Sequence, residues 1–441
     1  MKHKKLISVL LFWALLSASA ASQIATAPPS PVIVRDSLGA AALGSTCLIL
    51  GCIVNEQIDG SLGQLFLITS PPGIPLQTFM QRLLGQAGIV DAEPDLLLRV
   101  TQSQTWPTPS GLYDTTPVGY YGTTVWNGYA HQPAAQIVNL PAVQAQQAFN
   151  PIGTGIVAVI DTGVDTTHPV LQGALTAGYD FTRNQSGGSE LADINQSTMA
   201  VVNGAAPAQV NHSTMAVVNQ QGYSEFSQSQ NADFGHGTMV AGIIHLVAPG
   251  AKIMALKSFH ADGTGRLSDV LRAIYFAAEN SASVVNMSFD FTTYSHELAN
   301  AVNHATQKGA VCVASVGNDG QPLVVYPAGL SNVIGVASTS NNDTLSSFSN
   351  YGQPPVWVGA PGEGIITTYP YGTYAAGWGT SFSAPFVSGT VALLRGISIS
   401  LDEQLAAQAI SHATYISPAL GYGRLDIYQA ATAWCQASAR C

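Results

Sequence analysis

Residues 155–163 read Gly-Ile-Val-Ala-Val-Ile-Asp-Thr-Gly, a short apolar run that ends in an acidic residue. A continuous run of Val and Ile is typical of a strand that is buried on both faces of a sheet. Similar runs recur further along the chain, at 252–256, 284–287, 311–316 and 333–337. Residues 268–280 lie among these runs and carry apolar side chains at helical spacing. The alternation predicts an α/β fold with a mostly parallel sheet and helices on both faces.

The chain is long and poor in charged residues. Its 441 residues suffice for one large domain and a smaller one, and 46% of them are hydrophobic, so a substantial core can form. Only 9% of the residues are charged, and the formal net charge is −10. Because phosphate binding needs clusters of Lys and Arg, and none is visible, we expect no nucleic acid as a partner.

The N-terminus predicts export. Lys2, Lys4 and Lys5 precede an apolar stretch at 7–16 that is too short to span a bilayer, and small residues at 18–20 offer a cleavage site. We therefore assign residues 1–20 to a signal peptide and expect a secreted, extracellular protein with no membrane span. The alternative is a buried N-terminal helix.

The five cysteines fit an exported protein. Cys47 and Cys52 are close enough in sequence to pair, and so are Cys435 and Cys441. Cys312 lies in an apolar run, and we expect it to be a small buried hydrophobe.

The chain divides into three parts after the signal peptide. Residues 32–100 predict a small α+β domain with a strand at 65–68 and a helix at 76–86. Residues 101–136 are rich in Tyr, Gly, Pro and Thr without periodicity, which predicts an exposed connector and a natural place for a maturation cut. The strand and helix pattern then predicts a large domain over 137–434. Within it, the stretch at 197–203 recurs at 213–219, and we interpret the region 184–230 as a surface insertion.

Three polar residues, each surrounded by small residues, occur in the order Asp161, His236 and Ser381. A serine hydroxyl is a poor nucleophile and needs a base within hydrogen-bond reach, and His is the side chain whose pKa suits that proton exchange. A buried carboxylate holds the imidazole in one tautomer. This chain order is one of those that build the same hydrolytic geometry. We predict that Asp161 orients His236 and that His236 activates Ser381.

The three motifs resemble those of the subtilisin-like serine proteases, the subtilases: Val159-Ile160-Asp161-Thr162-Gly163, Gly235-His236-Gly237-Thr238 and Gly379-Thr380-Ser381-Phe382-Ser383-Ala384-Pro385. The resemblance extends over about 137–433 and implies a subtilisin-like fold and a secreted serine endopeptidase that forms an acyl-enzyme. The domain at 32–100 resembles the inhibitory pro-domains of the family in pattern and position. That resemblance implies a self-processing zymogen whose own pro-domain is an intramolecular inhibitor; the alternative is an independent accessory domain.

The resemblance also assigns residues around the triad. Asn318 matches the residue that supplies a side-chain amide to the oxyanion hole, beside the backbone N–H of Ser381. Segments with Gly263, Gly265 and Ser288 match edges that pair with an extended peptide. Segments at 314–317, with Ser315 and Gly317, and at 325–328 match the primary side-chain pocket. Their apolar character predicts a preference for uncharged side chains.

Two departures from the family pattern concern specificity and metal binding. Ser288 is followed by Phe289-Asp290-Phe291 where the family has a turn like Leu-Gly-Gly, so the pocket rim carries bulk and a charge. Val170 stands where many relatives carry a calcium-ligating Asp, which removes one oxygen ligand. We expect no metal in the chemistry and no required cofactor; a structural calcium ion is allowed elsewhere, without an assigned site.

Two rival functions stay open at this stage. The first is a catalytically silent binding or surface protein on the same scaffold, against which stand the four filled positions of the triad and Asn318. The second is an esterase or transpeptidase with the same triad, against which stands the Gly-Thr-Ser context of the nucleophile, unlike the Gly-x-Ser-x-Gly elbow. The leading prediction therefore names proteins or peptides as substrates.

Overall fold

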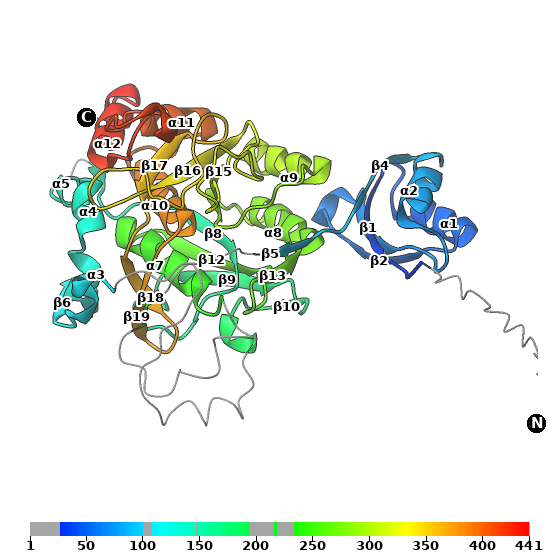
Figure 1. Ribbon diagram of the computed structural model, residues 1–441, viewed down its shortest axis with the longest axis horizontal. Coiled ribbons are helices and arrows are strands. Elements are labelled where there is room, and N and C mark those ends of the chain that lie inside the picture. The colour runs from blue at the N-terminus through cyan, green and yellow to red at the C-terminus, as the bar shows by residue number, and fades with distance from the viewer. Residues whose placement is uncertain (1–26, 100–107, 147–148, 194–215, 218–232, 441) are drawn as a thin grey trace, which may run out of the picture.

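The structure is a computed structural model that describes residues 27–99, 108–146, 149–193, 216–217 and 233–440. It consists of a small N-terminal unit, residues 27–94, and a large α/β body, and the two lie side by side (Figure 1). The predicted signal peptide and the first copy of the duplicated stretch lie outside the described residues. Of the second copy, only residues 216–217 are described.

The N-terminal unit is a four-stranded antiparallel sheet in the order β2-β3-β1-β4, with two helices on one face. The helix-facing side of the sheet includes Val32 and Phe66, and the opposite side sends Ile33 and Leu65 into the core of the body. The predicted strand at 65–68 and helix at 76–86 are confirmed, although the helix is two residues shorter. The elements are β1 (Pro31–Asp36), α1 (Ala40–Leu50), β2 (Ile53–Gln57), η1 (Gly60–Leu62), β3 (Leu65–Thr69), α2 (Leu76–Leu84) and β4 (Ile89–Pro94).

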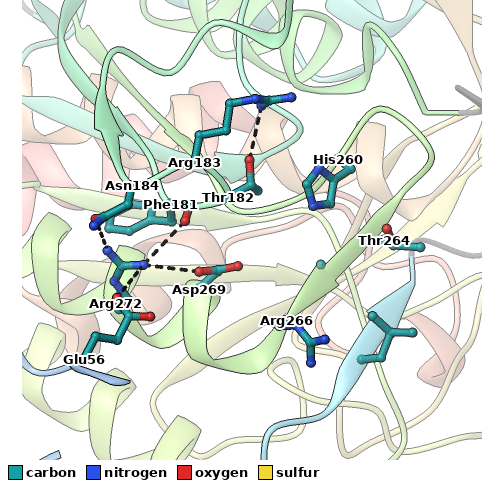
Figure 2. Close-up of a pocket in the computed structure, with 12 residues that line it drawn as sticks. Glu56, Phe181, Thr182, Arg183, Asn184, His260, Thr264, Arg266, Asp269 and Arg272 are labelled. Atoms are coloured by element: carbon teal, nitrogen blue, oxygen red, sulfur yellow. Dashed lines mark hydrogen bonds and ion pairs between the residues drawn. The ribbon is translucent and has the colours of Figure 1, made fainter. Parts of the chain in front are cut away.

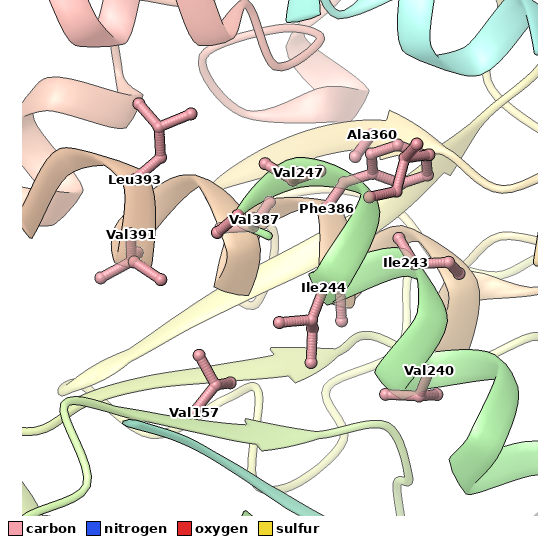
Figure 3. Packing of buried hydrophobic residues seen from close by; sticks show 14 of the residues in the cluster. Val157, Val240, Ile243, Ile244, Val247, Ala360, Phe386, Val387, Val391 and Leu393 are labelled. Atoms are coloured by element: carbon pink, nitrogen blue, oxygen red, sulfur yellow. The ribbon is translucent and has the colours of Figure 1, made fainter. Parts of the chain in front are cut away.

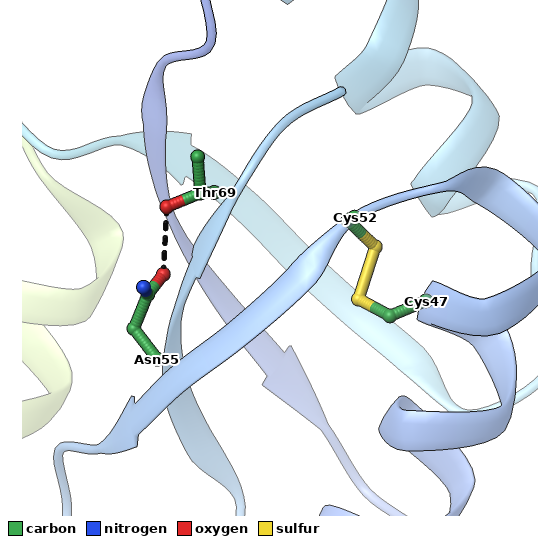
Figure 4. The surroundings of a disulfide bond; sticks show 4 residues. All are labelled: Cys47, Cys52, Asn55 and Thr69. Carbon is green, nitrogen blue, oxygen red and sulfur yellow. Dashed lines mark hydrogen bonds between the residues drawn. A yellow bond between two sulfur atoms is a disulfide. The ribbon is translucent and has the colours of Figure 1, made fainter. Parts of the chain in front are cut away.

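A disulfide bond between Cys47 and Cys52 ties the C-terminal part of α1 to the start of β2 (Figure 4). This pairing confirms the prediction from their spacing. Cys312 is a free, fully buried thiol, as expected. The predicted pairing of Cys435 with Cys441 is not described, because Cys441 lies outside the described residues.

The body is built on an eight-stranded sheet in the order β10-β9-β12-β8-β14-β15-β16-β17, in which every neighbouring pair except β10 and β9 is parallel. Each predicted apolar run forms one of its strands. The strands are β8 (Ile156–Asp161), β9 (Leu175–Asp180), β10 (Gln185–Ser186), β12 (Lys252–Lys257), β14 (Val284–Met287), β15 (Val311–Ser315), β16 (Val333–Thr339) and β17 (Val358–Pro361).

Helices cover both faces of this sheet, as predicted. In β8, Val157 and Val159 pack in the core on the side of α7 and α10, whereas Ala158 and Ile160 pack in the core on the side of α8 and α9. Figure 3 shows the first of these cores, with α7 and α10 against the sheet. The helices are α7 (His236–Val247), α8 (Leu267–Glu279), α9 (His296–Gln307), α10 (Thr380–Ile397), α11 (Glu403–Ile410) and α12 (Ile427–Ala437), with a short η5 (Pro418–Leu420).

Residues 108–136 differ from the exposed connector that their composition predicted. Leu112, Val125 and Tyr129 are buried in the same core as α7, and the hydroxyl of Tyr129 donates to the carbonyl of Gly242 at 2.8 Å. Short turns and a hairpin carry too little periodicity to be recognised, yet aromatic side chains supply the buried area. The elements are η2 (Ser110–Tyr113), β6 (Pro117–Tyr120), β7 (Thr123–Trp126), α3 (Asn127–Ala130), α4 (Pro133–Ile137) and α5 (Leu140–Gln144).

A small antiparallel sheet lies beside α7 and is formed by β18 (Ile365–Tyr369), β19 (Thr373–Gly377) and β11 (Ala216–Val217). The two described residues of the second copy of the duplicated stretch, Ala216 and Val217, thus pair with β19. In the described part of the chain, no helix combines the length and the apolar character needed to cross a bilayer.

Candidate active site

Asp161 and His236 form the pair that the sequence predicts. Asp161 is the last residue of β8, His236 is the first residue of α7, and Nδ1 of His236 lies 2.8 Å from Oδ1 of Asp161. Burial by itself would lower the pKa of His236, but the charge and hydrogen bond of Asp161 outweigh it and raise the pKa above its ordinary value. With Nδ1 donating to the carboxylate, Nε2 of a neutral imidazole is left to accept a proton. This Nε2 is buried and has no hydrogen-bond partner among the described residues.

A glycine allows α7 to approach β8 this closely. A Cβ on Gly237 would lie 2.0 Å from the carbonyl oxygen of Gly163 and 3.2 Å from Cβ of Asp161. The backbone N–H of Gly237 donates to the hydroxyl of Thr162 at 3.0 Å. A larger residue after His236 would therefore push the imidazole away from its carboxylate.

Glu190, which the sequence did not single out, lies behind this pair. Its fully buried carboxylate accepts a hydrogen bond from the backbone N–H of Gly235 at 2.7 Å and another from the hydroxyl of Thr238. Burial raises its pKa to about 8. Glu190 belongs to η4 (Glu190–Asp193), so the start of the predicted surface insertion is in fact core. The reason is that the free N–H groups at the start of α7 need a buried acceptor, which comes from a distant part of the chain.

Lys257, the last residue of β12, is a second buried group that the sequence analysis missed. Its ammonium donates to the carbonyl oxygens of Thr162 at 2.7 Å and Phe259 at 2.6 Å, and lies 2.7 Å from the carboxylate of Asp193. A buried charge is tolerated only when it is paired in this way. Lys257 thereby fixes the turn that follows Asp161. A lysine directly after an apolar run was the available signal.

Ser381 is the second residue of α10, and the residue after it contacts His236. The ring of Phe382 packs against the imidazole of His236 with 5.4 Å between centroids. The hydroxyl of Ser381 donates to the backbone carbonyl of Ser288 at 3.1 Å. The side chain of Ser288 is buried and donates in return to the backbone carbonyl of Ser381 at 2.9 Å. The predicted substrate contact at Ser288 therefore also holds the nucleophile's segment.

Asn318 lies in the loop after β15 and reaches the same end of α10. Its side-chain oxygen accepts hydrogen bonds from the backbone N–H of Thr380 at 2.8 Å and from the hydroxyl of Thr380 at 3.0 Å. Because the oxygen is engaged with Thr380, the NH₂ group of the amide points away from that residue and remains a donor. The N–H groups of the first helical turn, including that of Ser381, have no partner within the helix. Asn318 and Ser381 thus present donors at one helix end.

The predicted substrate edge is occupied by the chain itself. Gly263 forms the turn before β13 (Thr264–Arg266), with φ of 76°. β13 pairs antiparallel with β5 (Leu97–Arg99), so that Leu98 lies opposite Gly265. A Cβ on Gly265 would lie 2.6 Å from the ring of Phe259, so glycine is needed here. The segment after the N-terminal unit adds a strand to this edge, as a peptide does in β-augmentation.

The predicted side-chain pocket carries a carboxylate beside its glycine. Ser315 is the buried last residue of β15, and Gly317 follows with φ of 93°. A Cβ on Gly317 would lie 3.2 Å from Oδ1 of Asp290 and 2.5 Å from Nδ2 of Asn350. Burial, together with the charge of Asp319, raises the pKa of Asp290 to about 7. The charge that the sequence placed at the rim therefore lies against Gly317.

In the described part of the chain, no group of three or more His, Cys, Asp or Glu side chains is arranged to hold a metal ion. Val170, where the resemblance implied a missing calcium ligand, is buried in the apolar core. His168 is also buried, with Nε2 3.0 Å from the carbonyl oxygen of Thr373.

These residues lie at the carboxyl edge of the parallel strands, where open α/β sheets place their chemistry. An imidazole on a buried carboxylate, next to a serine at a helix N-terminus, defines the class of serine hydrolases. Comparison with known families supports the assignment to the serine hydrolases and narrows it to one family. The model of the subtilase family matches residues 153–423, and the chain belongs to that family.

Known relatives agree with this assignment. The chain is 37% identical over 284 residues to a thermophilic serine proteinase from Bacillus sp. (strain AK1), a match that covers 63% of this chain and 61% of the relative. It is 36% identical over 264 residues to thermitase from Thermoactinomyces vulgaris, with coverages of 57% and 79%. Family and relatives together support a serine-type endopeptidase, as the sequence predicted.

A solved structure shares the fold. Fervidolysin from Fervidobacterium pennivorans, described as a keratinolytic enzyme related to subtilisin, matches with a TM-score of 0.69 and 23% identity. The match covers 93% of this chain and 62% of fervidolysin, which confirms the subtilisin-like fold. The chain thus spans less than two thirds of fervidolysin and of the Bacillus proteinase.

Proposed function

We propose that this chain is a secreted serine endopeptidase that hydrolyses peptide bonds in proteins and is made as a self-processing zymogen. The observation that carries the proposal is the hydrogen bond of 2.8 Å between His236 and Asp161, with Ser381 at the start of the neighbouring helix. The subtilase relatives support the same reaction. Export rests on residues 1–20, whose basic start and short apolar stretch are typical of a signal peptide.

In the proposed reaction, the hydroxyl of Ser381 rotates from the carbonyl of Ser288 to Nε2 of His236 and attacks the substrate carbonyl. His236 takes the hydroxyl proton, and Asp161 stabilises the resulting imidazolium. The Asn318 amide and the N–H of Ser381 hold the oxyanion. His236 then gives the proton to the leaving amine, and water releases the acyl group by the reverse steps. These residues supply every proton transfer, so we propose that the chemistry needs no cofactor.

We further propose that the N-terminal unit is the intramolecular inhibitor. β5 occupies the edge at Gly265 that an extended substrate would use, which supports this role. The maturation cut would fall between Val100 and Pro107. Residues from 108 onward contribute buried side chains such as Tyr129 to the body, and would have to stay with it. The proposed substrate contacts are Gly263, Gly265, Ser288, Ser315 and Gly317.

The test is the intact mass of the purified exported protein, wild type beside Ser381→Ala, with and without a fluorophosphonate probe. We expect the wild type to lose residues up to a site in 100–107 and to gain one probe adduct, and Ser381→Ala to do neither. Two full-length, unlabelled proteins would overturn the proposal in favour of a silent binding protein. Processing in both, with label on wild type only, would overturn self-processing but keep the enzyme.

A panel of matched peptide and ester substrates separates the remaining rival. An esterase would turn over the esters and leave the peptides intact, whereas an endopeptidase cleaves both. Hydrolysis of esters alone by a labelled, processed protein would therefore contradict the proposed function.

A further inference from the structure

A pocket of about 550 Å³ beside β13 has no role in the proposed reaction (Figure 2). The body contributes Arg266, Arg272, His260 and Phe181 to its wall. Among the described residues, the N-terminal side contributes Leu97 from β5 and Glu56 from β2. The pocket therefore lies where the body meets the strand that occupies its substrate edge.

Each of two arginines in this pocket is balanced by a carboxylate from the N-terminal side. Arg272 lies 5.2 Å above the ring of Phe181, and its Nη1 is 3.2 Å from Oε2 of Glu56. Nη1 of Arg266 is 3.6 Å from Oδ2 of Asp95. Arg272 is mostly buried, whereas half of the Arg266 side chain is exposed. Both acidic partners precede the proposed cut between Val100 and Pro107, so both leave the body when the segment before the cut is removed.

The remaining charges of the pocket do not replace these partners. Asp269 of the body faces Arg272 at 3.4 Å and is the one carboxylate of the body among the described residues that line the pocket. Arg183, on the opposite wall, is already paired with Asp180 and Asp193. His260 adds no negative charge. Two arginines would then share a single carboxylate, that of Asp269.

The register of the strands decides which substrate residue meets this pocket. Leu97 lies opposite Arg266 in the antiparallel pair, lines the pocket and is 58% exposed. Leu98 lies opposite Gly265, faces the other way and is 3% exposed. Successive side chains of a strand point to opposite faces, so a peptide bound in the register of β5 sends the residue at the place of Leu97 into the pocket.

We propose that this pocket is a substrate subsite that selects Glu or Asp at the residue taking the place of Leu97, through Arg266 and Arg272. The inference rests on the proposed endopeptidase function and names part of its specificity. A substrate carboxylate supplies the two arginines with the negative charge that Glu56 and Asp95 provide before maturation. The chain itself carries leucine at this place, so its own segment lacks the favoured group.

Quenched fluorescent peptides of residues 94–107, with Glu, Gln or Lys at the place of Leu97, test the proposal on protein expressed as the full chain. Ser381→Ala is the blank. We expect kcat/KM to be highest for the Glu peptide, lower for the Gln peptide and lowest for the Lys peptide. Each arginine should contribute a roughly two- to five-fold difference in kcat/KM between the Glu and Gln peptides, as for a half-exposed charge pair. High salt should reduce the preference, because it screens exposed charges.

The matched variants are Arg266→Gln and Arg272→Gln, and the readout is the ratio of Glu to Gln peptide within each enzyme. We expect this ratio to fall in each variant and to approach one when both changes are combined. Arg266→Gln keeps the test decisive if the more buried Arg272 cannot be replaced without loss of folding. Equal cleavage of all three peptides, or a Glu preference that survives Arg266→Gln unchanged, would overturn the subsite. No cleavage of any peptide would instead overturn the endopeptidase function.

Discussion

Ser288 and Ser381 exchange two hydrogen bonds, one from each hydroxyl to the backbone carbonyl of the other residue, at 2.9 Å and 3.1 Å. Pro385 accounts for the first of them. It lies four residues after Ser381 inside α10 and has no N–H, so the carbonyl of Ser381 lacks its helical donor. The hydroxyl of Ser288 fills that place and itself accepts from Nδ2 of Asn286 at 2.9 Å. The second bond directs the Ser381 hydroxyl to the carbonyl of Ser288, and Nε2 of His236 has no partner among the described residues.

Replacement of Ser288 by alanine should destabilise the fold by about 1–3 kcal/mol, because it leaves a buried carbonyl and a buried amide without partners. Pro385→Ala restores an N–H that can reach the carbonyl of Ser381, so the double variant should recover about 1 kcal/mol of this loss. Urea unfolding of the full chain in the Ser381→Ala background measures these differences without self-digestion. Strictly additive effects of the two changes would contradict the assignment of Ser288 as the substitute donor.

The pair of His236 and Asp161 predicts the acid limb of the pH–rate profile. Only the neutral imidazole can accept the proton of Ser381, and Asp161 raises the pKa of His236 in spite of burial. We therefore expect kcat/KM to increase with pH with a midpoint above about 6.5, the ordinary histidine value. Asp161→Asn should lower this midpoint, because it removes the largest contribution that opposes burial, and should reduce the rate by about 10⁴-fold. A wild-type midpoint well below that of free histidine would contradict this reading of the pair.

Asn318 offers a way to separate positioning from catalysis. Asn318→Asp keeps the oxygen that accepts from Thr380 but loses the NH₂ donor. We expect it to keep the unfolding midpoint close to wild type while kcat falls by about 10²–10³-fold or more. The matched control, Thr380→Val, removes the hydroxyl bond to Asn318 and keeps the donor, so its kcat should fall much less. Equal losses of kcat in the two variants would rule out Asn318 as an oxyanion donor.

Much of the fold follows from local patterns in the chain. Strands such as β8 are apolar over their whole length, and this marks them as central strands with helices on both sides. Residues 108–136 do not follow from such patterns, because aromatic residues such as Tyr129 contribute to the core from turns without a period. The register of β5 on β13 was out of reach as well, since a three-residue strand leaves no pattern that fixes its partner.

The sequence motifs predict the three catalytic residues of the candidate site but not the groups that support them. Asp161, His236 and Ser381 stand in short, glycine-rich contexts that a reader of the sequence can recognise. Glu190 and Lys257 have no such context, and their roles arise from contacts across more than forty residues. The identity of these supporting groups depends on which backbone donors and acceptors the tertiary fold leaves buried, and this is decided only after the strands are paired.

Glu93 lies where the N-terminal unit contacts the body, and its burial leads us to expect that rising pH weakens this contact. Its carboxylate meets the start of α9, where it accepts from Ser295 at 2.6 Å and from the N–H of His296 at 3.2 Å. Burial raises its pKa from 4.5 to about 7, so the contact is fully favourable below about 4.5 and is lost as the pH rises through about 7. Hydrogen exchange at the first turn of α9 in full-length Ser381→Ala, corrected for the intrinsic effect of pH, should be at least roughly ten-fold faster at pH 8 than at pH 5.

Glu93→Gln should flatten this pH dependence. The matched change Asp402→Asn, which also removes a carboxylate that caps a helix, should leave it unchanged. Exchange that slows as the pH rises would show that Glu93 is charged in the contact and would reverse the prediction.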